Sequence, residues 1–153
     1  PADVLILDEP TSALDVSVQA QILNLLLDLQ EQLHLTYLVI THDLNVIRYI
    51  SDRIAVMYLG KLVEFGPAQE ITDHARHPYT KGLLDASPIL DPTQRGRKKD
   101  VMKGDPGSLI NISEGCRFCD RCKYATEECE KKTPGDTMIG ENHQVACFHP
   151  LNL

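Results

Sequence analysis

The 153 residues are enough for one ordinary domain, or for part of a domain with a small module attached. Hydrophobic residues make up 42% and support a packed core, while the 5% aromatic content and the absence of Trp predict an aliphatic one. The formal net charge of −7 gives no electrostatic reason to expect a nucleic-acid partner. No apolar run approaches the ~20 residues that cross a bilayer, so we expect any membrane association to be peripheral. The chain begins at Pro1 without a secretory leader, so we expect it to start inside a longer protein.

A first strand is predicted at Val4 to Leu7, where four apolar residues run into Asp8 and Glu9 and then into a proline. A continuous apolar run of this length is typical of a strand buried on both faces in a parallel sheet. The two carboxylates then stand at its C-terminal end, where open α/β sheets place their ligands. Two acids there suit Mg²⁺-nucleotide chemistry, in which one orients the cation and the other accepts a proton from water. An ordinary strand that ends in an acidic turn is the alternative.

A helix and a second strand follow. Asp15 or Ser17 can cap the helix. The second strand, residues 36–41, ends in Thr41, His42 and Asp43, and Asp43 or Thr41 is expected to cap a short helix over residues 44–50. The order strand, helix, strand, helix is the pattern of a parallel sheet. The apolar residues at helical spacing in the first helix are Val18, Ile22, Leu25, Leu26, Leu29 and Leu33.

Residues 54–59 and 62–65 are predicted strands that flank Gly60 and Lys61, a two-residue hairpin connection of the primed type. Lys61 and Glu64 are expected to face solvent, with no catalytic role.

A helix that starts at Pro78 is predicted next. His74 and His77 lie close together, but no neighbouring residues would complete a metal site, so we expect surface or packing roles for both. Periodicity then disappears from residue 89 to about 110, which indicates a linker or an extended arm.

All five cysteines lie between Cys116 and Cys147. Their clustering, without a secretory leader, favours a metal site over a disulfide framework. It also indicates a reducing compartment. Thiolates suit Zn²⁺ or an iron–sulfur cluster, and binding would supply folding energy that a short polar segment lacks. Spacing alone favours Cys116, Cys119 and Cys122 as ferredoxin-like ligands. Reduced cysteines packed as small hydrophobes, without a metal, are the remaining alternative.

Several stretches resemble one family. Residues 5–15, Leu-Ile-Leu-Asp-Glu-Pro-Thr-Ser-Ala-Leu-Asp, resemble the Walker B motif and D-loop of ABC-type ATPases nearly letter for letter. His42 resembles their switch histidine, and residues 53–67 are similar to the antiparallel ending of their nucleotide-binding domains. Residues 77–88 and the cysteine segment resemble the oligopeptide/dipeptide and nickel branch of ABC importers.

The resemblance implies roles for residues near the first strand, with ATP and Mg²⁺ as cofactors. Asp8 would hold Mg²⁺ through its water shell, Glu9 would polarise the water that attacks the γ-phosphate, and His42 would sense that phosphate. The D-loop would meet the opposite subunit across the bound ATP. Its residues would be Ser12, Ala13, Leu14 and Asp15.

In the cysteine segment the resemblance implies a [4Fe–4S] cluster, which some members carry. Zn²⁺ is the alternative. Cys119 departs from the family pattern, so it is expected to be free or to act as an exchange ligand. The implied cluster ligands are Cys116, Cys122, Cys129 and Cys147.

The predicted fold is therefore α/β, the C-terminal half of an ABC-type P-loop NTPase domain with a parallel sheet and an antiparallel ending, plus a small Cys-rich extension. The expected boundaries are residues 1–86 for the ATPase part, 87–112 for the linker and 113–153 for the Cys-rich domain. No Gly-x-x-x-x-Gly-Lys-Ser/Thr phosphate loop and no Leu-Ser-Gly-Gly signature occur in the sequence, so we expect the chain alone to bind little ATP.

The predicted function is ATP hydrolysis that energises peptide import, on the cytoplasmic face of the cell membrane. The expected partners are a second ATPase subunit, membrane permease subunits and, indirectly, a solute-binding protein. A nickel or other small-solute importer of the same branch is an alternative. A soluble ABC ATPase would not explain the cysteines, and a metal-binding regulatory module would leave Asp8, Glu9 and His42 without a role.

Overall fold

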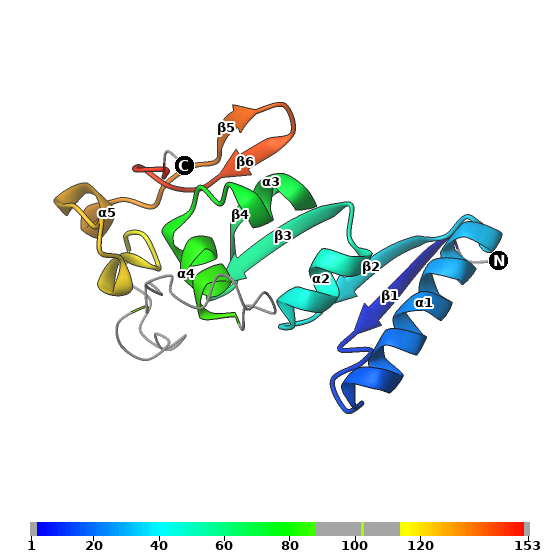
Figure 1. Ribbon diagram of the computed structural model, residues 1–153. Coiled ribbons are helices and arrows are strands. Elements are labelled where there is room, and N and C mark those ends of the chain that lie inside the picture. Colours follow the sequence, from blue (N-terminus) through cyan, green and yellow to red (C-terminus); the bar gives the residue numbers. More distant parts are fainter. Residues whose placement is uncertain (1–2, 88–101, 103–113, 152–153) are drawn as a thin grey trace. The chain divides into compact units, whose positions relative to one another are not determined.

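The computed structural model describes residues 3–87, 102 and 114–151, and the chain divides into two compact units, Pro1–Ser51 and Asp52–Leu153. Both units contain helices and strands, so the mixed α/β class is confirmed (Figure 1). The expected boundaries at residues 86 and 112 stay a prediction. The predicted linker, residues 87–112, lies outside the described residues except for Ser87 and Met102. None of the described helices is long and apolar enough to cross a membrane.

In the first unit, strands β1 (Val4–Asp8) and β2 (Thr36–Ile40) pair in parallel, from Val4 opposite Thr36 to Asp8 opposite Ile40. Helix α1 (Val16–Leu33) connects the two strands, and helix α2 (Leu44–Ile50) follows β2. Because the strands run in the same direction and in register, the residues that follow Asp8 and Ile40 lie at one edge of the sheet.

The helix starts in this unit follow the local capping chemistry. The Asp15 carboxylate accepts the N–H groups of Ser17 and Val18, each at 3.0 Å, and so caps α1. Asp43 caps α2 by accepting the Asn45 N–H at 2.8 Å. Two cap residues were proposed for each helix. Asp15, and not Ser17, caps α1, and Asp43, and not Thr41, caps α2.

The core of the first unit forms where α1 and α2 meet, around Leu23, Val46 and Ile50. The expectation that β1 is buried on both faces is wrong for this chain, since Val4 is 57% and Ile6 63% exposed. Val4 and Ile6 lie on the same face of β1, and no β1 residue belongs to the core cluster of this unit among the described residues.

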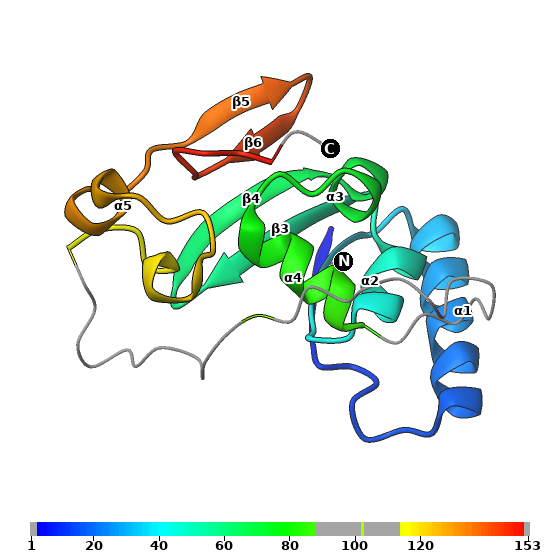
Figure 2. The same cartoon turned by 60° about the vertical axis from the view of Figure 1, so that its left-hand side comes forward.

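The second unit is built on one antiparallel sheet in the order β3-β4-β6-β5 (Figure 2). Strands β3 (Arg53–Tyr58) and β4 (Lys61–Pro67) form the predicted hairpin. Strand β6 (His143–Val145) pairs with β4 on one side and with β5 (Thr137–Gly140) on the other, so the C-terminal segment shares a sheet with the hairpin.

Short helices complete this unit. Helix α3 (Ala68–Asp73) follows β4, and α4 (Pro78–Ala86) begins at its proline as predicted. A single 3₁₀ turn, η2 (Cys119–Arg121), and helix α5 (Glu127–Lys131) lie in the cysteine segment.

The β3–β4 connection is displaced by one residue from the prediction. Tyr58 pairs with Lys61, so the two-residue loop is Leu59 and Gly60 rather than Gly60 and Lys61. Both loop residues have positive φ, 43° and 75°, as a primed turn requires. Glycine takes this conformation without strain, whereas Leu59 takes it because the strand register demands it.

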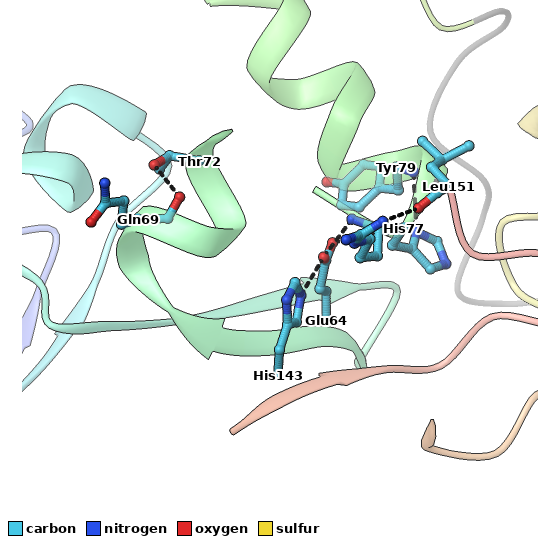
Figure 3. A network of polar contacts seen from close by, with 8 residues as sticks. Glu64, Gln69, Thr72, His77, Tyr79, His143 and Leu151 are labelled. Atoms are coloured by element: carbon cyan, nitrogen blue, oxygen red, sulfur yellow. Dashed lines mark hydrogen bonds and ion pairs between the residues drawn. The ribbon is translucent and has the colours of Figure 1, made fainter. Parts of the chain in front are cut away.

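Glu64 is buried, which corrects the expectation that it faces solvent. The residue is 1% exposed, and its carboxylate accepts the backbone N–H groups of Arg76 at 2.6 Å and His77 at 3.0 Å (Figure 3). His143 Nε2 lies 2.8 Å from the same carboxylate. His143 is on β6, which pairs with β4, the strand that carries Glu64. The two N–H groups and the imidazole therefore take the place of the water molecules that would hydrogen-bond to an exposed carboxylate.

The residues after α3 hold further parts of the unit together. Arg76 and Leu151 exchange two hydrogen bonds, from Arg76 Nη1 to the Leu151 carbonyl at 2.9 Å and from the Leu151 N–H to the Arg76 carbonyl at 2.8 Å.

His77 is buried and caps α4 by accepting the Tyr79 N–H at 3.0 Å. Burial lowers the pKa of His77 to about 4, so its imidazole is neutral at pH 7 and serves as an acceptor. The expected packing role of His77 is confirmed.

Replacing Glu64 by alanine is expected to destabilise the second unit strongly. The change leaves two backbone N–H groups and a buried imidazole without their acceptor, at an expected cost of about 3 kcal/mol in the free energy of unfolding. Urea denaturation followed by circular dichroism measures it. Glu70→Ala, an exposed position on α3, is the matched control and should change stability by less than about 0.5 kcal/mol. Equal effects of the two substitutions would contradict the structural role of Glu64.

Candidate active site and cysteine pocket

Glu9 and His42 meet at the shared edge of strands β1 and β2. Each residue lies just beyond the end of its strand, and His42 Nδ1 lies 2.7 Å from Glu9 Oε1. The Glu9 N–H donates to the Ile40 carbonyl at 2.8 Å, and its φ of 47° turns the chain sharply away from β1. The two side chains are 36% and 81% exposed, so the pair is open to solvent and to a ligand.

The contact changes the protonation of both side chains. The hydrogen bond with His42 holds the pKa of Glu9 below its usual 4.5, and the hydrogen bond with Glu9 raises the pKa of His42 above 6.5. The pair is therefore carboxylate and imidazolium from below pH 4.5 to above pH 6.5. Its contribution to stability is lost as pH falls through the lowered pKa of Glu9 or rises through the raised pKa of His42.

The other sequence-predicted residues of this region lie on the same turn. Asp8 is the last residue of β1 and is exposed. Ser12 folds back on Glu9, since its N–H and its hydroxyl both donate to the Glu9 carbonyl, at 3.3 and 3.2 Å. Asp15 caps α1 and is exposed. The segment from Asp8 to Asp15 is thus anchored at Glu9 and at the start of α1.

Thr41 contacts the site in a way that sequence reasoning missed. Its hydroxyl lies 3.4 Å from Glu9 Oε2, the carboxylate oxygen that His42 does not contact. The sequence marked Thr41 only as a possible helix cap, because Glu9 is 32 residues away and no local spacing connects the two.

All five cysteines line one pocket in the second unit, together with aromatic and histidine side chains. The segment folds through short turns, with the Cys119 N–H bonded to the Cys116 carbonyl and the Cys122 N–H bonded to the Cys119 carbonyl. Burial raises the pKa of Cys119 and of Cys147 to about 11, so these groups are thiols at pH 7. The other pocket residues are His77, Pro78, Phe118, Tyr124, Phe148 and His149.

Gly115 lets the pocket close at one end. A Cβ at this position would lie 2.3 Å from the Cys129 carbonyl oxygen, and the next N–H, that of Cys116, donates to that carbonyl at 2.7 Å. Only glycine permits such an approach, which brings Cys116 beside Cys129.

The five cysteines share this pocket with a largely apolar wall, and sulfur is a soft ligand. Among the described residues, no group of three or more His, Cys, Asp or Glu is placed to hold a metal ion.

Residues 63–129 match the family described as the oligopeptide/dipeptide transporter, C-terminal region. The match begins within β4, includes α3 and α4, and ends within α5. This part of the second unit is therefore similar to the C-terminal region of that transporter family.

Curated relatives resemble nearly the whole chain. It is 47% identical over 147 residues to the dipeptide transport ATP-binding protein DppF of Haemophilus influenzae, covering 96% of this chain and 45% of that protein. The oligopeptide transport ATP-binding protein OppF of the same organism is 46% identical over 149 residues, with 97% and 45% covered. The probable D,D-dipeptide transport ATP-binding protein DdpF of Escherichia coli is 53% identical over 153 residues, with 97% and 48% covered.

The chain thus spans about half the length of the curated relatives it matches. The family match and these relatives show that the chain is similar to a portion of dipeptide and oligopeptide transport ATP-binding proteins.

The Glu9–His42 contact is expected to be visible in solution. In an NMR titration of this chain, the His42 imidazole should titrate above pH 6.5, and Glu9→Gln should move its midpoint down because the carboxylate charge is lost. Glu31→Gln, which removes an exposed carboxylate at the other end of α1, serves as the control and should leave the midpoint unchanged. An identical His42 midpoint in the wild type and in Glu9→Gln would show that the contact does not form.

Proposed function

We propose that this chain is the hydrolytic part of an ATPase subunit that energises the import of dipeptides or oligopeptides. The observation that carries the proposal is the contact between Glu9 and His42 at one sheet edge, in a chain whose relatives are named as peptide transport ATP-binding proteins. An exposed carboxylate with a depressed pKa is ionised at pH 7 and can accept a proton.

The proposed roles follow from the positions of the side chains. Asp8, exposed at the end of β1, would hold Mg²⁺ through water. Magnesium, when bound, neutralises charge on the transferred phosphoryl group. Glu9 accepts the proton of the attacking water, and His42, as imidazolium, offers a donor to a phosphate oxygen while it orients Glu9.

The turn from Ser12 to Asp15 is proposed to face a second ATPase subunit. Its exposed residues extend from Glu9 and end at the cap of α1, so a partner that pressed on the turn would also act on Glu9. The complete subunit would work at the cytoplasmic face of the membrane with permease subunits and, through them, a solute-binding protein. A nickel or other small-solute importer would use the same residues, but the relatives' names favour peptides.

In the complete subunit, Glu9→Gln is expected to lower ATP turnover at least about 100-fold, because the amide cannot accept the proton. ATP binding should persist, so an ATP-bound dimer should accumulate. Phosphate release and size-exclusion chromatography with Mg-ATP measure the two effects.

The control is Glu31→Gln, which should turn over like the wild type. Unimpaired turnover in Glu9→Gln would rule out Glu9 as the base.

We also propose that the cysteine pocket holds a [4Fe–4S] cluster on Cys116, Cys122, Cys129 and Cys147. The support is that these residues, from the turn segment around η2, from helix α5 and from the segment after β6, line the same pocket. When bound, the cluster would supply cross-linking of this segment and one-electron chemistry. Cys119 lines the pocket as a fifth thiol and is proposed to be a non-ligand.

Anaerobic reconstitution of this chain is expected to give a brown protein with about four iron and four sulfide per chain. Cys122→Ser should lose most of the iron, whereas Cys119→Ser, a change of the same size, should keep it. Iron and sulfide analysis with absorption spectroscopy measures this. A colourless protein without iron would contradict the cluster, and zinc in its place would favour the alternative.

A further inference from the structure

The contacts of the Glu9 carboxylate divide between two neighbouring residues. His42 Nδ1 lies 2.7 Å from Oε1, and Thr41 Oγ1 lies 3.4 Å from Oε2. One contact leaves a carboxylate free to rotate about its last bond, whereas contacts at both oxygens fix its plane. The plane matters for a base because it decides where the lone pair that takes the proton points.

The direction of the Thr41 hydroxyl is set by a second contact. Its oxygen accepts the Asp43 N–H at 3.1 Å, so its own proton is left to donate toward Glu9. Asp43 is itself held, because its carboxylate caps α2 at Asn45 and accepts from Gln19 of α1 at 3.3 Å. The Thr41 hydroxyl is thus anchored to both helices of the first unit.

The two contacts also differ in exposure. The His42 side chain is 81% exposed, while Thr41 is half-buried. A ligand phosphate has more access to His42 than to Thr41. Thr41 therefore gives Glu9 a second contact, at the carboxylate oxygen that His42 does not contact, while His42 engages a ligand.

From this geometry we infer that Thr41 is a positioning residue for the Glu9 carboxylate in ATP hydrolysis. The inference rests on the proposed function, since it assigns Glu9 as the base. Thr41 acts through Glu9 and does not itself contact the reacting atoms.

The test uses the complete subunit and the variants Thr41→Val and Thr41→Ser. Valine keeps the shape and loses the hydroxyl, so kcat should fall about 10-fold while KM for ATP changes by less than about twofold. Serine keeps the hydroxyl and should restore most of kcat. Thr36→Val, an exposed threonine at the other end of β2, is the matched control and should behave like the wild type.

The pH profile of kcat separates positioning from a packing defect. The Thr41 hydroxyl is among the groups that lower the pKa of Glu9. Removing it in Thr41→Val should therefore move the acid limb of the kcat profile to higher pH. A packing defect would lower kcat at every pH and leave the limb in place.

Each outcome decides one question. If Glu9→Gln loses turnover but Thr41→Val keeps full kcat and an unmoved limb, the Thr41 inference is wrong and the proposed function stands. Loss of activity in Thr41→Val that serine does not restore also overturns the inference. If Glu9→Gln turns over normally, the proposed function fails first. Thr41→Val introduced into Glu9→Gln should cause no further loss, and an added 10-fold loss would show that Thr41 acts independently of Glu9.

Discussion

The second unit depends on the burial of one carboxylate. Glu64 on β4 has almost no exposed surface and is kept there by two backbone N–H groups and one imidazole. A buried carboxylate is tolerated only when its oxygens are satisfied, so the corner at Arg76 and His77 and the strand with His143 must come to it. The contact between Glu64 and His143 joins the C-terminal strands to the hairpin. The corner at Arg76 and His77 also places His77 and Pro78 in the wall of the cysteine pocket. Glu64 does not itself line the cysteine pocket, but its carboxylate helps to position two residues of the pocket wall.

Sequence reasoning was accurate for the helix starts, where the deciding contacts are local. Asp15, Asp43 and Pro78 start their helices because a cap or an N1 proline acts within one turn of chain. The hairpin was found but shifted by one residue, since the sequence shows the glycine and not which flanking residue, Leu59 or Lys61, shares the turn with it. Local patterns thus gave the existence and type of the elements and left their register to tertiary contacts.

The errors concern burial and long-range contact. Glu64 was expected in solvent because a charged residue in an alternating strand ordinarily is, and its partner His143 lies 79 residues away. Val4 and Ile6 were expected to be buried, but they are exposed, since burial of a strand face depends on what packs over it and no strand pattern reveals that. The candidate site shows the same division: the motif named Glu9 and His42 by resemblance, but it gave no sign of Thr41, whose contact exists only once two strands pair in register.

The molecule contains the same side-chain pair twice, with different consequences. Glu9 and His42 lie 2.7 Å apart, and Glu64 and His143 lie 2.8 Å apart, so distance does not distinguish them. Exposure does: the first pair is 36% and 81% exposed, the second 0% and 6%. An exposed pair contributes little to stability and exchanges its partners readily, which suits a carboxylate that must receive a proton and a histidine that must meet a ligand. A buried pair cannot lose a partner without leaving the other unsatisfied, which suits a fixed join between strands. The local surroundings of each glutamate, more than its hydrogen bond to histidine, therefore decide whether the pair serves chemistry or architecture.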